Sequence, residues 1–287
     1  MYKKIYEFLV WDNCNNNCQF CWQREQPRLY DYNKRIMILN EVLNFIKSDK
    51  FEKGSHILIC GGEIFDKPSD FTALSSFFFN IIQFMKQGIV DLLYINTNLI
   101  YTDMSGVWDL LSHLEEAGLI SRIRFTTSYD VEGRFKSIES EKLMLRNLED
   151  VGNKYSNMHI VANTILTKPA CEAILSGKLN LKKFMETNNC WVNLIPYIVL
   201  DDKLTADRAT IFKTLTYVGK QNPGYLEKYV PNMAITQEKW LYMFKDNKFQ
   251  FCSCPMSVCG HSVNFKKYCK EGTCFCCDIE EIFNAII

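Results

Sequence analysis

The first 200 residues alternate between two kinds of apolar segment, and this alternation restricts the possible folds more than any other feature. Short apolar runs typical of strands occupy residues 5–11, 56–60, 92–96, 123–127, 159–166 and 191–200. Segments with apolar residues at helical spacing lie between them, at 31–48, 68–87, 104–117, 138–151 and 169–186. This alternation predicts a parallel sheet, which right-handed crossovers can curl into a full or a partial barrel. We therefore expect an α/β fold, a partial (β/α)6 TIM-type barrel, over residues 1–200.

The pattern changes after residue 200. Residues 205–218 and 236–244 have the spacing of helices, whereas residues 251–278 are rich in cysteine and have little periodicity. A segment with so few apolar side chains cannot form a core of its own and is expected to fold around metal. We predict that residues 201–287 form a helical linker and a small Cys-rich, metal-binding C-terminal extension.

The 13 cysteines are concentrated near the two ends of the sequence, which favours metal binding over disulfides. The alternative is a secreted, disulfide-rich protein, which the odd number of cysteines and the lack of a leader-like run in residues 1–10 oppose. The most apolar stretch, residues 71–85, is interrupted by Ser75, Ser76, Asn80 and Gln83 and is shorter than the roughly 20 residues of a membrane span. We expect a cytoplasmic protein without a membrane partner.

Charge is balanced, with 33 basic and 33 acidic residues. No broad basic field is therefore available to bind a nucleic-acid backbone, and we do not expect a nucleic-acid partner. The sequence also lacks the glycine patterns of P-loop and Rossmann nucleotide sites.

Three cysteines follow the first predicted strand in the spacing Cys14-x3-Cys18-x2-Cys21. Three thiolates can bind three irons of a [4Fe–4S] cluster, which leaves the fourth iron open to a reactant. The alternative is a structural zinc loop with its fourth ligand elsewhere, although zinc loops favour paired C-x2-C spacings.

This motif resembles that of the radical S-adenosylmethionine (SAM) superfamily, including the aromatic residue, Phe20, before the third cysteine. The resemblance implies that SAM chelates the open iron through its amino and carboxylate groups. One electron from the cluster would then cleave SAM to methionine and a 5'-deoxyadenosyl radical, which abstracts hydrogen from a substrate. It also implies that Phe20 lies against the adenine, and that a flavodoxin or ferredoxin supplies the electron.

A second motif, Gly61-Gly62-Glu63, follows the second predicted strand and Cys60. Two glycines allow the backbone to approach a ligand closely, and a glutamate can accept from an ammonium group. The segment is similar to the glycine-glycine-glutamate of the same superfamily, which implies that it binds the amino group of SAM. We interpret Cys60 as a packing residue of the strand.

Polar residues also follow the next three predicted strands, and Asn98, Ser128, Asp130 and Asn163 are the candidates among them to bind SAM. The resemblance implies contacts with the carboxylate or ribose of SAM, or with the substrate, and it places Pro196 near the adenine. Ser, Thr and Asn also cap helices at these places in any α/β protein, so capping stays open as an alternative.

The cysteine-rich segment at residues 251–278, called here the C-terminal block, resembles the SPASM and twitch extensions of radical SAM enzymes, which carry auxiliary iron–sulfur clusters. Its spacing departs from the usual C-x2-C-x5-C-x3-C core, and zinc is an open alternative to iron–sulfur. His261 is a possible extra ligand. The ligands would come from Cys252, Cys254, Cys259, Cys269, Cys274, Cys276 and Cys277.

Together these motifs predict a radical SAM enzyme that acts on a peptide or protein side chain. A radical SAM enzyme acting on a nucleotide, nucleoside or modified base, with structural zinc in its C-terminal block, is the alternative. A non-enzymatic metal-binding scaffold is more remote, since a scaffold has no need of an open iron. No residue that acts directly on the substrate can be assigned from the sequence.

Overall fold

The computed structural model describes residues 4–11, 13–19, 21, 30–195, 203–225, 239–245 and 248–252, with backbone only at residues 11, 208, 239–245 and 248–252. Its strands are β1 (Ile5–Trp11), β2 (Ser55–Gly61), β3 (Val90–Asn96), β4 (Ile123–Ser128), β5 (His159–Ile165), β6 (Trp191–Ile195), β7 (Lys239–Lys245) and β8 (Lys248–Cys252). Its helices are α1 (Tyr32–Lys47), α2 (Phe71–Lys86), α3 (Ser105–Glu116), α4 (Ile138–Lys154), α5 (Lys168–Leu175), α6 (Leu181–Asn188) and α7 (Arg208–Gln221), with short 3-10 helices at Pro68–Asp70 (η2) and Ile120–Arg122 (η3).

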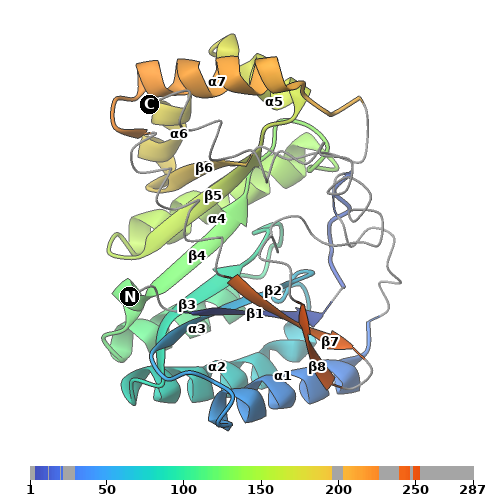
Figure 1. Cartoon of the computed structure of the whole chain (residues 1–287), viewed down its shortest axis with the longest axis vertical. Coiled ribbons are helices and arrows are strands. Elements are labelled where there is room, and N and C mark those ends of the chain that lie inside the picture. The colour runs from blue at the N-terminus through green and yellow to red at the C-terminus, as the bar shows by residue number, and fades with distance from the viewer. Residues whose placement is uncertain are drawn as a thin grey trace.

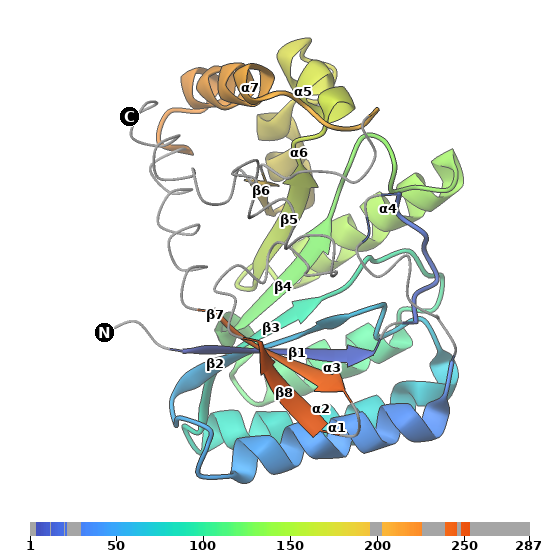
Figure 2. The ribbon, with the colours of Figure 1, turned by 45° about the vertical axis from the view of Figure 1, so that its right-hand side comes forward.

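The described strands form one sheet in the order β6-β5-β4-β3-β2-β1-β7-β8. Strands β1 to β6 pair in parallel, in the order of the chain, and helices connect them. Figure 1 shows the sheet fanning from β1 to β6, with α1 and α2 near one end and α5 and α7 near the other. Figure 2 shows the fanned sheet from a second direction, in which α1, α2 and α3 cover one of its faces. The predicted α/β fold, with six parallel strands alternating with helices, is confirmed.

The two faces of the sheet differ in chemistry. On the face covered by helices, Phe8, Ile59, Ile95 and Phe125 are at most 1% exposed and belong to the main core. Burial of one such side chain is worth roughly 1.5–3 kcal/mol. The opposite face carries half-buried polar and charged side chains, among them Glu7, Tyr94, Arg124, Ser128, Asn163 and Asn193. The strands therefore present polar groups on the side of the sheet that faces away from α1, α2 and α3.

Helix α2 is the most apolar helix of the fold, and its residues Phe77 and Phe78 are buried in the main core while Phe79 is exposed. Packing against the sheet accounts for the apolar composition of this helix. Within the described residues, no helix is both long enough and apolar enough to cross a lipid bilayer.

The segment predicted as a weakened helix at 169–186 forms two helices, α5 and α6. Gly177 has a φ of +75°, a left-handed conformation that interrupts the helix and that glycine adopts without a steric penalty. Asn180 then starts α6 by accepting a hydrogen bond from Lys183 N at 3.0 Å. Gly177 and the N-cap residue Asn180 thus separate α5 from α6.

The prediction of a helix at 236–244 was wrong, because residues Lys239–Lys245 form strand β7. This strand pairs in parallel with β1 and in antiparallel with β8. Its sequence, KWLYMFK, is rich in aromatic residues that favour strands. Pairing with β1 satisfies the backbone groups at an edge that would otherwise be open. Residues 239–252 thus add strands to the sheet, whereas the boundary predicted at residue 200 stays a prediction.

Candidate functional site

The cysteine loop, defined here as residues 13–19 and 21, follows β1 at the carboxyl end of the sheet. Hydrogen bonds join it to the segments that follow β2, β3 and β4. Ligand sites of α/β barrels and open sheets lie at this end, because the loops that follow parallel strands meet there. The topology therefore brings motifs that are far apart in the sequence to one place.

The segments after β2 and β3 hold the first half of the cysteine loop. Glu63 N donates to Asn13 O at 2.9 Å. The Asn98 side chain donates to Asn15 Oδ1 at 2.7 Å, and Asn15 Nδ2 donates to the backbone oxygen of Ile100. The predicted Glu63 and Asn98 thus lie next to the loop that carries Cys14.

The segment after β4 holds the other side of the cysteine loop. Gln19 N donates to Gly133 O at 2.7 Å, and Lys136 Nζ donates to Asn15 O at 2.7 Å. Gly133 adopts a φ of +83°, which glycine accommodates readily where this segment turns back. The cysteine loop is therefore fixed from two sides.

The sulfur atoms of Cys14 and Cys18 both accept hydrogen bonds from N–H groups. Cys14 Sγ accepts from Asn16 N at 3.4 Å and from Asn98 Nδ2 at 3.5 Å. Cys18 Sγ accepts from Asn16 Nδ2 at 3.3 Å and from Arg134 Nη1 at 3.6 Å. N–H donors stabilise negatively charged sulfur, including the thiolate ligands of iron–sulfur clusters. The chemistry around these cysteines fits such a group.

Cys21 N donates to Cys18 O at 3.2 Å, so the third cysteine lies in the same turn as the second. Burial is the main cause that raises the pKa of the Cys18 thiol, and the positive charge of Arg134 opposes this rise. Among the described residues, no three side chains of His, Cys, Asp or Glu are already gathered as a metal site. Cluster binding would draw the three sulfur atoms together, since metal sites often form fully only with their metal.

Glu63 is completely buried, and its carboxylate accepts hydrogen bonds from three groups that the structure describes. Phe65 N and Thr97 Oγ1 donate to Oε1 at 3.2 and 2.8 Å, and Asn98 N donates to Oε2. Burial raises the pKa of Glu63 to about 7, although the three hydrogen bonds oppose the rise. A cation close to this carboxylate would favour its charged form. Gly61 precedes it with a φ of +136°, a conformation that side chains disfavour.

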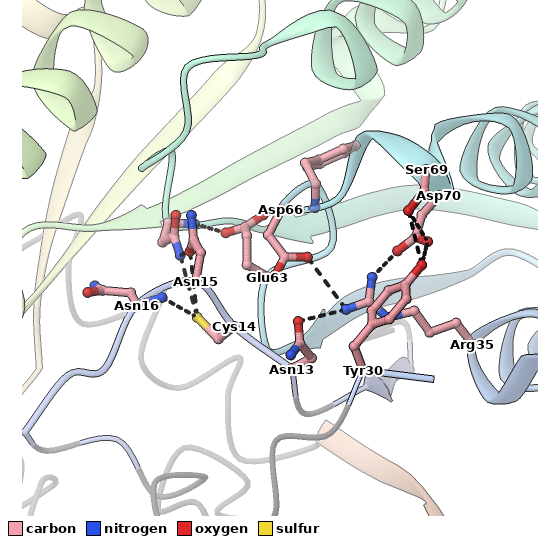
Figure 3. A network of polar contacts seen from close by, with 12 residues as sticks. Asn13, Cys14, Asn15, Asn16, Tyr30, Arg35, Glu63, Asp66, Ser69 and Asp70 are labelled. Carbon is pink, nitrogen blue, oxygen red and sulfur yellow. Dashed lines mark hydrogen bonds and ion pairs between the residues drawn. The ribbon is translucent and has the colours of Figure 1, made fainter. Parts of the chain in front are cut away.

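A second buried charge, Arg35 at 3% exposed, lies beside this site (Figure 3). Its guanidinium donates to Asp70, to Asp66 Oδ1 at 3.5 Å and to Asn13 Oδ1 at 3.2 Å. Tyr30 stacks on the guanidinium at 4.8 Å and donates its hydroxyl to Asp70 at 2.6 Å. The network ties α1 to the segment after β2 and to the start of the cysteine loop.

Sequence reasoning missed the Arg35 network, although a signal for it is present. Arg35 precedes Ile38, Leu39 and Val42 at helical spacing, so it occupies the buried face of α1. A charged residue on the apolar face of a helix needs a buried partner. Asp66 and Asp70, which follow the glycine-glycine-glutamate motif, are those partners.

The other candidate residues occupy different surroundings. Ser128 and Asn163 are register partners on β4 and β5, on the half-buried polar face of the sheet. Asn193 Nδ2 donates to Asn163 Oδ1 at 3.1 Å. Asp130 is completely buried and binds Ile165 N and Arg134. Cys60 is buried in β2, as its interpretation as a packing residue predicts.

Several predicted residues lie outside the part of the chain that the structure describes. They are Phe20, Pro196, His261 and six cysteines of the C-terminal block, whereas Cys252 is described only by its backbone at the end of β8. Their predicted roles stay predictions.

No family model and no curated protein matches this chain. Solved structures do match it in fold. Native anSMEcpe with bound AdoMet (S-adenosylmethionine) and Cp18Cys peptide is 14% identical with a TM-score of 0.50, and the match covers 80% of this chain and 61% of that one. Native anSMEcpe with AdoMet alone is 14% identical with a TM-score of 0.50, covering 80% and 62%. A histidine-tagged form of anSMEcpe with bound AdoMet is 13% identical with a TM-score of 0.51, covering 80% and 59%.

This chain therefore spans less than two thirds of the length of the solved structures that it matches. At this level of identity the likeness concerns the fold. It agrees with the α/β architecture of six parallel strands alternating with helices that the sequence predicts. The activity of the chain is therefore a matter for proposal.

Proposed function

We propose that this chain is a radical SAM enzyme in which Cys14, Cys18 and Cys21 bind a [4Fe–4S] cluster with one open iron. The main support is the cysteine loop itself, whose sulfur atoms accept N–H donors and which contacts the segments after β2, β3 and β4. The matched structures carry AdoMet in a similar fold, which agrees with this proposal.

When bound, the cluster and SAM would supply the one-electron chemistry that produces a 5'-deoxyadenosyl radical. The protein would position both groups. Asn16, Asn98 and Arg134 would stabilise the ligand sulfur atoms. Glu63 would accept from the ammonium group of SAM, with Gly61 and Gly62 leaving room for the ligand.

The polar face of the sheet supports the further proposal that Ser128 and Asn163 contact SAM or the substrate. Both are half-buried, and they lie opposite each other near the carboxyl ends of β4 and β5. Phe20, Asn98 and Asp130 complete the proposed SAM-binding set. A low-potential flavodoxin or ferredoxin would deliver the electron.

The proposed substrate class is a peptide or protein side chain. Its support is that one matched structure, anSMEcpe, holds a Cp18Cys peptide together with AdoMet. The Cys-rich C-terminal block would bind an auxiliary cluster or zinc, with its ligands drawn from the seven cysteines between residues 252 and 277.

The test is anaerobic reconstitution with iron and sulfide, followed by reduction in the presence of SAM and chromatography of the products. We expect 5'-deoxyadenosine from the wild-type protein and none from Cys18→Ala. Cys190→Ala is the matched control, because Cys190 lies between α6 and β6, outside the cysteine loop, and this variant should retain the product. An intact wild-type cluster that yields no 5'-deoxyadenosine would refute the proposal.

A further inference from the structure

Arg134 joins a cysteine of the loop to a buried carboxylate. Its Nη1 donates to Cys18 Sγ at 3.6 Å, and its Nε donates to Asp130 Oδ2 at 2.5 Å. The Asp130 side chain is 0% exposed and the Arg134 side chain is 11% exposed. The guanidinium and the carboxylate are therefore held largely out of water, where charges act on their neighbours more strongly than at the surface.

Contacts at the ends of two strands fix this pair in place. Asp130 Oδ1 accepts from Ile165 N at 2.7 Å, at the end of β5. Beside it, Thr164 Oγ1 donates to the backbone oxygen of Tyr129 at 2.8 Å. Asp130 therefore has one oxygen anchored to the sheet and the other on Arg134, which limits how far the guanidinium can move from Cys18.

The segment that carries Arg134 is also joined directly to the cysteine loop. Gly133, its neighbour, accepts from Gln19 N at 2.7 Å, next to Cys18 in the sequence. The backbone contact and the side-chain contact lie one residue apart on both segments. Arg134 and Cys18 are thus held together by more than their own hydrogen bond.

The charges of Arg134 and Asp130 would have opposite effects on a cluster bound through Cys18. An arginine guanidinium keeps its positive charge in proteins, so Arg134 places a fixed cation between Cys18 and Asp130. Adding one electron to an iron–sulfur cluster adds one negative charge. A fixed cation nearby stabilises the reduced cluster and raises its reduction potential, whereas a fixed anion lowers the potential.

We propose that Arg134 and Asp130 set the reduction potential of the cluster bound through Cys18. This inference rests on the proposed function. Arg134 raises the potential through its contact with the ligand sulfur. Asp130 holds the guanidinium in position and partly offsets its charge. Both are positioning residues that act on the cluster, and neither needs to touch the substrate.

The test is an anaerobic redox titration of the reconstituted full chain, monitored by the electron paramagnetic resonance signal of the reduced cluster. In Arg134→Met we expect the ratio of reduced to oxidised cluster at a fixed potential to fall at least tenfold, which is about 59 mV for a one-electron couple. In Asp130→Asn the ratio should rise. Arg134→Lys should fall between wild type and Arg134→Met.

The matched control is Arg146→Met, which removes the same charge from an exposed position on α4. Solvent screens this charge, so the ratio should change less than threefold. Shifts in the same direction for Arg134→Met and Asp130→Asn would overturn the proposal, because loosened packing does not reverse sign with charge. An unshifted potential in Arg134→Met would overturn it as well.

Iron content separates a failure of this inference from a failure of the proposed function. If the wild-type protein binds no cluster, the proposed function fails. If Arg134→Met alone fails to assemble a cluster, the reduction potentials of Arg134→Lys and Asp130→Asn test the inference instead, because both variants keep a hydrogen-bonding side chain at the altered position. A wild-type potential in both of these variants would contradict the inference.

Discussion

Replacing Glu63 with glutamine tests whether this carboxyl group is buried in the way that the structure shows. Burial raises its pKa from the ordinary value of 4.5 to about 7, so the folded protein binds a proton at pH values where the unfolded chain has released it. At 1.36 kcal/mol per pKa unit, the shift corresponds to about 3 kcal/mol. The cluster-free protein should therefore lose about 3 kcal/mol of folding stability as pH rises from about 4.5 to above 7.

Glu63→Gln should remove this pH dependence. The glutamine amide adds a fixed cost, because its NH2 group replaces one oxygen that accepts from Phe65 N, Thr97 or Asn98 N. The free energy of unfolding of the variant minus that of the wild type should therefore rise by about 3 kcal/mol between pH 4.5 and pH 8.

Urea unfolding, monitored by tryptophan fluorescence at several pH values, measures this difference. Glu116→Gln, at the exposed end of α3, controls for the loss of one carboxylate. A difference between wild type and Glu63→Gln that is the same at every pH would refute the burial argument. A difference that moves in the opposite direction would refute the sign of the shift.

Three further predictions concern other parts of the chain. Arg35→Met should lower the free energy of unfolding, measured in urea, by about 3–5 kcal/mol, because Asp66 and Asp70 are left buried without their cation. The double variant Arg35→Met/Asp70→Asn should be more stable than Arg35→Met alone, because it removes one of the two buried charges. Gly152→Ala should lower the free energy of unfolding by about 1–3 kcal/mol in the same assay, since its new Cβ would clash with the backbone oxygen of Asn188. A neutral result would refute the packing of α4 on α6. Cys276→Ala should lower the metal content of the full chain, measured by elemental analysis for iron and zinc, while the spectrum of the cluster proposed at Cys14, Cys18 and Cys21 stays unchanged. Loss of both signals together would contradict the separation of the two proposed sites.

The arrangement of strands β1 to β6 and the helices between them could be predicted because local signals agree with the fold. Strand and helix periods alternate along the chain, and parallel strands bring successive loops to one end of the sheet. The contact of Glu63 and Asn98 with the cysteine loop follows from that topology. The sequence therefore predicts that these motifs lie close together, although it does not predict the contacts of their side chains.

Features that depend on distant pairing were not predictable in this way. Strand β7 lies more than 200 residues after β1, its parallel partner, and no local period in 239–245 indicates that pairing. The roles of Arg35 and Arg134 depend on which buried groups each guanidinium meets in three dimensions. For Asp130, the sequence indicated a place at the strand end, and only the structure shows its hydrogen bonds to Arg134 and Ile165.

The most direct test of the central claim is an electron paramagnetic resonance experiment on the anaerobically reconstituted, reduced protein, recorded with and without SAM. If Cys14, Cys18 and Cys21 leave one iron open, SAM should bind that iron and change the spectrum of the reduced cluster, and Cys14→Ala should abolish the SAM-sensitive signal. A reduced-cluster spectrum that SAM does not alter, or a cysteine loop that binds zinc and gives no cluster signal, would contradict the account.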